Sequence, residues 1–285
     1  MIITALLLLN FLLMITLPIL LARWIQQRYR PGWAFWGMGA ATFVLSQVGH
    51  IPFNLVVQQL GWLPGDVDAW GNLVITAVFL GLSAGIFEES ARYLTYRFWA
   101  KDARVWKKGL MLGAGHGGIE AILVGLLGLV NFGVLLAIRN GTLLDVIPAE
   151  QLPLVEQQIE AMFGLPWYMT LLGAVERIFA ISFHLSASLL VMQVFVRGQL
   201  RWLWAAIGWH TLINALAVIT VTRWGAVAAE VSTGLIAVLS IVIILRLRDG
   251  DEPVEEEEEV EGETAVFHPP QPTITTEKLD ETRYS

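Results

Sequence analysis

Long apolar stretches separated by short polar loops fill the first 248 residues of this chain. A helix needs about 20 apolar residues to cross the hydrocarbon core of a membrane. Seven stretches qualify, at 2–22, 34–58, 71–98, 109–137, 167–196, 202–221 and 225–245. The first stretch lacks the basic start and the small-residue cleavage site of a signal peptide, so we interpret it as a retained span. The pattern predicts an all-α, polytopic membrane helix bundle with about seven transmembrane helices.

Basic residues gather on one side of the predicted membrane. Lys and Arg are retained in cytoplasmic loops, and seven spans place twelve of them on the same side: Arg23, Arg28, Arg30, Arg97, Lys101, Arg104, Lys107, Lys108, Arg197, Arg201, Arg246 and Arg248. The opposite loops hold only Arg139 and Arg223. We therefore expect a plasma-membrane protein with its N-terminus outside and its C-terminus in the cytoplasm. Membrane lipids are the expected surroundings, and we expect no nucleic-acid partner.

Composition separates the two ends of the chain. The whole chain is 55% hydrophobic and 15% charged, as membrane proteins are. Thirteen of its 25 acidic residues follow Arg248, five of them consecutive at 255–259. We expect a transmembrane helical domain at 1–248 and an acidic, disordered cytoplasmic tail at 249–285.

In the outer loop, residues 148–163 show helical spacing and predict a short surface helix. The chain has no cysteine, which excludes thiolate catalysis and Cys-ligated metals.

Charged and polar side chains interrupt four of the apolar stretches. A charge at the bilayer centre costs about 2.5 kcal/mol or more, so such residues are rare and usually functional. The residues concerned are Glu88, Glu89, Arg92, His116, Glu120, Glu176, Arg177, His184, His210 and Asn214. Their number on separate spans indicates one buried polar site.

The two carboxylates of the double glutamate in the third stretch can have different roles, one as the partner of an arginine and the other as a general base. Residues three and four apart share a helix face, so Arg92 neighbours both Glu88 and Glu89. The arginine can hold one carboxylate ionised and leave the other as a general base. An ion pair that only locks two helices together is the alternative interpretation.

Depth in the membrane relates three of these residues. Glu88, His116 and His210 lie about ten, seven and eight residues from the cytoplasmic ends of their spans, which is a similar depth at about 1.5 Å per residue. Side chains at one depth on separate helices can converge on one cavity. His50 lies nearer the outer face, so we expect it outside this cluster.

The remaining polar residues have less specific patterns. Glu120 lies one turn from His116, and Asn214 lies one turn from His210, where it can fix a tautomer or bind an oxyanion. His184 has serines around it and fits a packing role as well as a functional one. Glu176 and Arg177 are adjacent, so we expect each to find a partner on another helix and to support or gate the site.

These segments together resemble the glutamic-type intramembrane proteases, a group that includes CAAX-processing and bacteriocin-immunity proteins with PrsW and YhfC relatives. The group pattern is a double glutamate followed by a basic residue, a His or Glu motif on the next helix, and His-x-x-x-Asn/Asp on a later one. The matching segments are Glu88-Glu89-x-x-Arg92, His116-x-x-x-Glu120 and His210-x-x-x-Asn214. Gly-His-Gly-Gly-x-Glu at 115–120, and Phe183-His184 downstream of Glu176-Arg177, favour the YhfC branch.

The resemblance covers residues from about 35 to 245 and implies hydrolysis of peptide bonds in membrane-embedded or lipidated protein substrates. By position it implies Glu88 as the base, Glu89 with Arg92 as its support, His116 and His210 as contacts of the water and the oxyanion, and Asn214 as an oxyanion donor. Arg92 lies one residue closer to the double glutamate than the arginine of the CAAX enzymes does. Leu112 stands where those enzymes have the phenylalanine of a Phe-x-x-x-His motif. Both differences argue against prenylated CAAX substrates.

Other hydrolytic classes fit less well. The zinc motif His-Glu-x-x-His is absent. Residues 81–85 match Gly-x-Ser-x-Gly, but that motif requires a strand–turn–helix elbow and here it lies in an apolar helix. His116, His184 and His210 with a glutamate suit zinc, so the sequence leaves metal-dependent and metal-free catalysis open.

Two further functions share the same residues. Networks of Glu, His and Arg inside membranes also serve proton- or cation-coupled transporters, although we find no convincing internal repeat of the transporter kind. A non-catalytic membrane adaptor that keeps the scaffold is the other alternative.

Overall fold

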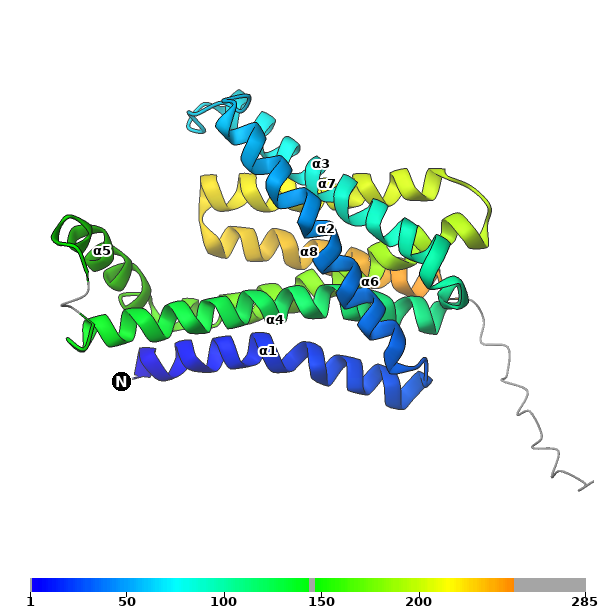
Figure 1. Ribbon diagram of the computed structural model, residues 1–285, viewed down its shortest axis with the longest axis horizontal. Helices are drawn as coiled ribbons and strands as arrows, with labels where there is room; N and C mark the ends of the chain where they lie inside the picture. Colours follow the sequence, from blue (N-terminus) through cyan, green and yellow to red (C-terminus); the bar gives the residue numbers. More distant parts are fainter. Residues whose placement is uncertain (1, 144–146, 249–285) are drawn as a thin grey trace, which may run out of the picture. The chain divides into compact units, whose positions relative to one another are not determined.

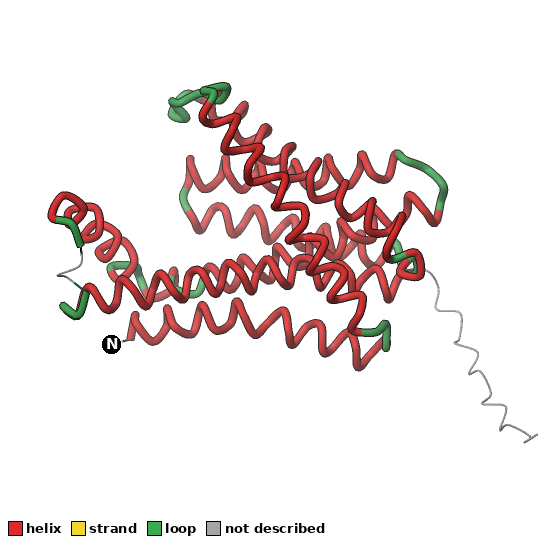
Figure 2. Tube along the Cα trace, in the orientation of Figure 1, coloured by secondary structure: helices red, strands yellow, loops and turns green. Residues whose placement is uncertain are grey.

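A computed structural model describes residues 2–143 and 147–248 (Figure 1). These residues form helices and connecting loops, with no strand among them (Figure 2). Within the described residues, seven helices are long and apolar enough to span a membrane, which confirms the predicted all-α membrane fold. The predicted tail at 249–285 lies outside the described residues, so the division into two parts stays a prediction.

Most of the helices extend past the predicted apolar stretches at one end or both, whereas the α-helix predicted at 167–196 begins at Leu172. In chain order they are α1 (Ile2–Tyr29), α2 (Trp33–Gln59), α3 (Trp70–Leu94), the π-helix η1 (Thr95–Trp99), η2 (Lys101–Ala103), α4 (Trp106–Arg139), η4 (Ala149–Gln151), α5 (Leu152–Phe163), η5 (Trp167–Met169), α6 (Leu172–Val196), α7 (Arg201–Trp224) and α8 (Ala226–Arg246). Helix α5 confirms the predicted surface helix. The added turns carry Trp, Tyr and Arg, which suit the membrane interface.

Helix α6 is the central helix of the bundle. In its most apolar stretch 72% of the residues are buried, against 22–33% in the other six spanning helices. It packs against α4, α7, α8 and α1, while α4 also packs against α1 and α2, and α3 packs against α7. A polar side chain on α3, α4, α6 or α7 can therefore face the interior of the bundle.

Glycines let the backbone of α4 approach two helices. A Cβ at Gly115 would lie 2.0 Å from the carbonyl oxygen of Trp36, and a Cβ at Gly39 would lie 2.0 Å from that of Leu112. On another side of α4, a Cβ at Gly117 would lie 2.8 Å from the His184 ring. Small residues at helix contacts allow this approach, and they bring His116 close to both α2 and α6.

The Gly-x-Ser-x-Gly match at 81–85 is a helix contact. Gly81 and Gly85 lie inside α3, where a Cβ would meet the backbone of α7 at Thr211 and Ile207 at 2.6 and 2.9 Å. The hydroxyl of Ser83 bonds the carbonyl of Leu80 on its own helix at 3.1 Å. The motif therefore holds α3 against α7 and forms no nucleophile elbow.

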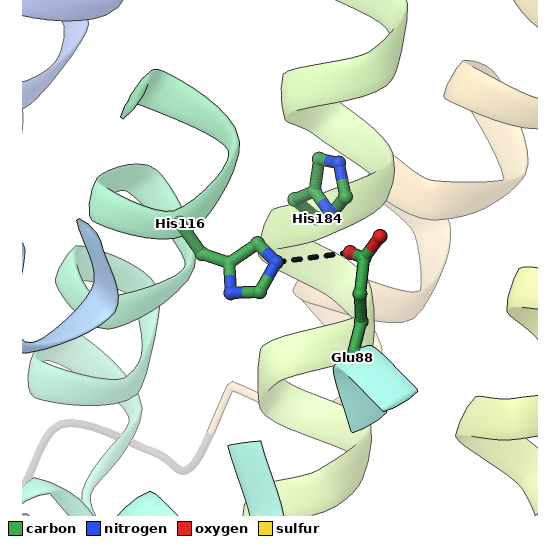
Figure 3. A group of neighbouring side chains, drawn as sticks. All are labelled: Glu88, His116 and His184. Carbon is green, nitrogen blue, oxygen red and sulfur yellow. Dashed lines mark hydrogen bonds and ion pairs between the residues drawn. The ribbon is translucent and has the colours of Figure 1, made fainter. Parts of the chain in front are cut away.

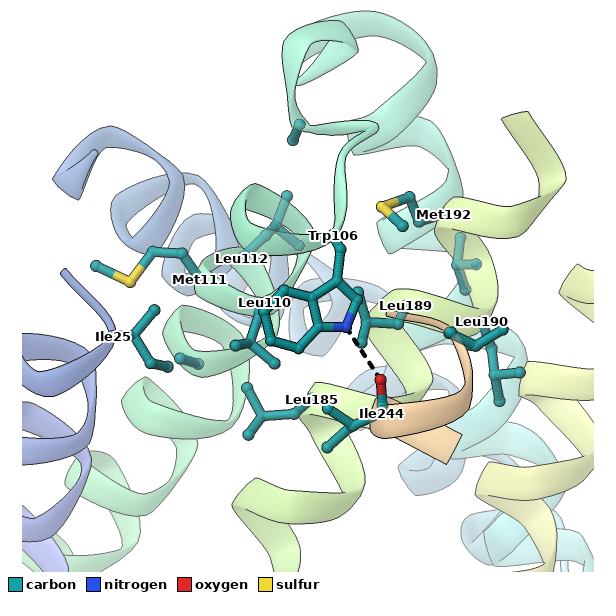
Figure 4. Close-up of a cluster of buried hydrophobic side chains, with 14 of the residues drawn as sticks. Ile25, Trp106, Leu110, Met111, Leu112, Leu185, Leu189, Leu190, Met192 and Ile244 are labelled. Atoms are coloured by element: carbon teal, nitrogen blue, oxygen red, sulfur yellow. Dashed lines mark hydrogen bonds between the residues drawn. The ribbon is translucent and has the colours of Figure 1, made fainter. Parts of the chain in front are cut away.

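The largest apolar core lies at the end of the bundle where the basic loops are. It joins the second half of α6 to the first half of α4 and to the ends of α1 and α8 (Figure 4). Trp106 donates from its indole nitrogen to the carbonyl of Ile244 at 3.0 Å and fixes α4 to α8 there. Tyr96 and Ser188 bond each other at 2.8 Å at the same end.

Candidate active site and metal centre

Four helices contribute buried polar side chains to one place in the bundle. Glu88 and Glu89 come from α3, His116 from α4, His184 from α6 and His210 from α7. None of the five is more than 6% exposed. The three residues placed at one depth by the sequence meet here, because Glu88 lies next to both His116 and His210. Their catalytic roles stay predictions.

Glu88 is held by side chains from three other helices. Its Oε2 lies 3.0 Å from Nε2 of His116 (Figure 3), and its Oε1 accepts a hydrogen bond from Nε2 of Gln47 at 3.2 Å. Nε2 of His210 lies 4.0 Å from the same Oε1. Phe43 packs edge-on against His116 with ring centroids 5.2 Å apart. The carboxylate is therefore fixed from α2, α4 and α7 together.

Glu89 is the carboxylate that pairs with the arginine. Arg92 forms an ion pair with Oε1 of Glu89, while its distance to Glu88 is 3.9 Å. Nδ1 of His210 lies 2.7 Å from the same oxygen of Glu89. Because a paired carboxylate accepts hydrogen bonds, Nδ1 of His210 carries the proton and its Nε2 keeps a lone pair on the side of Glu88.

His184 does more than pack between helices. Its Nδ1 lies 2.6 Å from Nη2 of Arg92, and its Nε2 lies 2.5 Å from Oε2 of Glu120. An arginine only donates, so Nδ1 accepts and the proton lies on Nε2, which donates to Glu120. Glu120 thus accepts a hydrogen bond from His184 on α6, and not from His116, which lies one turn before it on α4.

The expectation of a partner on another helix is correct for Arg177, which reaches Glu120 on α4, and wrong for Glu176, which pairs with Arg177 on its own helix. Arg177 forms an ion pair with Glu176 and donates from Nε to its Oε2 at 2.8 Å. The same guanidinium donates from Nη1 to Glu120 at 2.8 Å. The arginine side chain is long enough to turn back to its neighbour and still reach α4.

His50 belongs to the network, contrary to the expectation from its depth. Its Nδ1 lies 3.1 Å from Oε1 of Gln47, whose amide nitrogen binds Glu88. Its Nε2 contacts Asn54 and Ser83 at 3.0 and 3.3 Å. Sequence analysis missed Gln47, although a glutamine inside the apolar stretch 34–58 was a visible signal.

A small polar cavity adjoins the cluster. It measures about 120 Å³ and is lined by residues of α3, α4, α6, α7 and α8: Glu88, Glu120, Glu176, Arg177, Ala180, Phe183, His184, His210, Ile213, Asn214, Ala217 and Thr233. A volume of this size holds several water molecules. The cavity thus brings Asn214, Glu120 and Glu88 to one space, as the sequence analysis expects.

The donor set suits a divalent metal ion. Glu88, His116 and His184 each offer one ligand atom, and the three atoms lie within 4.8 Å of one another (Figure 3). Two His and one Glu are a set found in catalytic zinc sites. Nε2 is the nitrogen of His116 that faces Glu88, whereas its Nδ1 points away from the group and has no hydrogen-bond partner among the described residues (Figure 3). The predicted ligand His210 is not in this group and contacts it through Glu88.

Charge supports the same fit. Four carboxylates, on Glu88, Glu89, Glu120 and Glu176, face the two guanidinium groups of Arg92 and Arg177. With neutral histidines, the cluster has an excess of negative charge inside an apolar bundle. Such an excess is costly unless it is balanced, and a dication would balance it.

Comparison with known proteins assigns the family. The model of the YhfC intramembrane metalloprotease family matches residues 13–237, which include every candidate residue named above. The chain belongs to the YhfC family. The "uncharacterized membrane protein YhfC" of Bacillus subtilis (strain 168) is 33% identical over 243 residues, covering 81% of this chain and 91% of that protein. No solved structure matches this YhfC-family chain.

Proposed function

We propose that this chain is an intramembrane metallopeptidase that cleaves peptide bonds of membrane-embedded or lipidated protein substrates. The observation that carries the proposal is the buried group Glu88, His116 and His184. It lies beside a cavity large enough for several water molecules, within the spanning helices. Its membership of a family named for intramembrane metalloproteases supports the same activity.

Glu88, His116 and His184 are the residues that would hold the metal, and their donor chemistry favours zinc. A bound zinc ion polarises a carbonyl and activates water for attack. Glu120 orients His184 by accepting a hydrogen bond from its Nε2–H, so the ligand atom would be Nδ1, which lies 2.6 Å from the guanidinium of Arg92.

The pair of Glu89 and His210 is suited to move the proton of the attacking water. Nδ1 of His210 is held by Glu89 at 2.7 Å, so its Nε2 accepts a proton and Glu89 stabilises the imidazolium that results. Asn214 borders the same cavity one turn along α7 and donates its amide N–H to the developing oxyanion.

A metal-free glutamic mechanism is the second candidate, and one contact favours it. The guanidinium of Arg92 lies 2.6 Å from Nδ1 of His184 and 3.9 Å from Glu88, so it supplies positive charge to two of the three metal-ligand candidates. In this mechanism Glu88 takes the proton from water, with His116 at 3.0 Å beside it.

A cleavage assay tests the activity. The purified full-length chain in detergent is incubated with a panel of single-span and lipidated peptides, with and without chelator. We expect Glu88→Gln and His184→Ala to lose cleavage, and Glu156→Gln, an exposed glutamate on α5, to keep it. Cleavage that chelator abolishes and zinc restores supports the metallopeptidase. Cleavage by Glu88→Gln at the wild-type rate would contradict both mechanisms.

We also propose that the chain lies in the plasma membrane with its N-terminus outside. The basic loops 23–32, 97–108 and 197–201 then face the cytoplasm, where positive charge is retained. The helix α5 and the loop after α4 face the outside in this orientation.

A further inference from the structure

The carboxylates of the site become more exposed from one end of the cluster to the other. The exposed fraction of the side chain is 0% for Glu89, 8% for Glu88, 21% for Glu120 and 37% for Glu176. Glu176 lies in the second turn of α6, at the end of the bundle opposite to the basic loops. The polar cluster therefore opens in one direction.

A further acidic residue lies at the same end. Glu230 is in the second turn of α8, close enough to Glu176 for their charges to interact. Its Oε2 is buried and has no hydrogen-bond partner among the described residues. A carboxylate oxygen in that position needs water or a cation, because a buried acceptor without a hydrogen-bond partner is unfavourable. The sequence analysis did not single out this residue.

The opposite end of the bundle is closed by apolar side chains. The large core between the site and the basic loops includes Met111, Leu112, Leu189 and Met192, all completely buried (Figure 4). The hydrogen bond from Trp106 to Ile244 crosses that end. The polar side chains of Tyr96 and Ser188 at this end are completely buried and bond each other, so they are not open to water.

We propose that water reaches the buried site along a polar path from the end of the bundle that carries the loop after α4, and not from the end with the basic loops. Glu230, Glu176, Arg177 and Glu120 line this path in order. Arg177 crosses it, with hydrogen bonds to Glu176 and Glu120 at 2.8 Å each. Charged side chains inside a membrane face such water-filled cavities.

The path fits water and small ions. The cavity lined by Glu176, Arg177 and Glu120 along this path measures about 120 Å³, which accommodates several waters. Excess carboxylates along the path attract cations and repel anions. The inference concerns access to the site, so it holds whether or not the site cleaves peptides.

Single cysteines test the path, because the natural chain has none to react in the background. Thr233→Cys places a thiol on the cavity wall. Leu235→Cys is the matched control, two residues along the same helix, because its side chain is 65% exposed and does not line the cavity. Thr142→Cys, after α4, and Gln199→Cys, between α6 and α7, mark the two membrane faces.

A cationic, membrane-impermeant thiol reagent is added to one face at a time, in cells and in inside-out vesicles. We expect Thr233→Cys to react only from the face that labels Thr142→Cys, and at least about tenfold faster than Leu235→Cys, since the thiolate forms only in water. Ala180→Cys, on the cavity wall of α6, repeats the test if Thr233→Cys folds poorly.

Labelling from the face of Gln199→Cys would overturn the proposal, and so would a rate no faster than that of Leu235→Cys. The readout needs no peptidase activity. If Thr233→Cys is not labelled as expected, the proposed peptidase function is unaffected. If it is labelled as expected but the protein cleaves no peptide, the proposed water path is unaffected.

Discussion

Arg92 connects the two halves of the polar cluster. It is completely buried, pairs with Glu89 on its own helix and donates to His184 on α6 at 2.6 Å. A buried charge is tolerated only while its partners are in place. The site thus depends on a cation that is fixed by residues far apart in the sequence.

Removal of the carboxylate of Glu89 should destabilise the fold. Breaking a buried ion pair from one side costs about 3–5 kcal/mol, so Glu89→Gln should lower the unfolding temperature of the detergent-solubilised protein clearly. Thermal unfolding followed by circular dichroism measures it, with Glu156→Gln as the exposed control. Equal unfolding temperatures for the two variants would show that the Arg92 pair carries little stability.

Gln47 should position Glu88 without touching the substrate. Its amide binds Oε1 of Glu88 at 3.2 Å, and it does not line the cavity. Groups that orient a ligand typically change activity or metal affinity 10–100-fold, so Gln47→Ala should lower kcat about tenfold and leave KM unchanged. Steady-state kinetics on any cleaved peptide checks this, with the exposed Gln58→Ala as control. A change confined to KM would place Gln47 in substrate binding instead.

The sequence predicted some of these contacts and not others. Helical spacing placed Arg92 beside both Glu88 and Glu89 but could not say which one it pairs with. That choice depends on contacts with distant residues. His210, which bonds Glu89, lies 121 residues away from it, and His184, which bonds Arg92, lies 92 residues away. His50 was misplaced because depth was judged from its backbone position. The side chain of Gln47 bridges the remaining gap to Glu88.

At the scale of helices, close backbone contact between α2 and α4 holds His116 in place. Gly39 and Gly115 lie in this contact, each facing the backbone of the other helix. Apolar length predicted that both helices exist, but it does not say which helix packs against which. Helix pairing depends on contacts between distant segments, and local spacing carries no information about it.

Adding one methyl group to this contact should separate the helices. We expect Gly39→Ala and Gly115→Ala to lower the unfolding temperature and to weaken any activity that depends on His116, because overpacking typically costs about 1–3 kcal/mol. Gly37→Ala is the matched control on α2, since nothing lies within 4 Å of a Cβ there. Thermal unfolding of the three variants measures this effect. Equal unfolding temperatures for all three would contradict the close contact between α2 and α4.

At the scale of the whole molecule, the cluster carries more negative than positive charge inside an apolar bundle. Glutamates within predicted spans were visible in the sequence, and the similar depth of Glu88, His116 and His210 predicted that these three side chains converge. The ligand set was only partly predicted, since His116 and His184 join Glu88 while His210 binds Glu89. The rotation of each helix about its axis decides this, and spacing along one helix does not fix it.

A bound dication should therefore stabilise the folded chain. A ligand at 1,000 times its Kd adds about 4 kcal/mol to the free energy of unfolding. Chelator should lower the unfolding temperature of the wild type and leave that of His184→Ala, which lacks a metal-ligand candidate, unchanged. An equal effect of chelator on both proteins would point to a metal bound elsewhere.

The most direct test of the metal centre is the metal content of the purified chain by mass spectrometry. The proposal predicts one divalent ion, zinc by its donor set, per wild-type chain. Glu88→Gln, His116→Ala and His184→Ala should each lose it, while Glu156→Gln should retain it. A wild-type chain that cleaves peptides without any bound metal would contradict the metal centre and leave the metal-free glutamate mechanism.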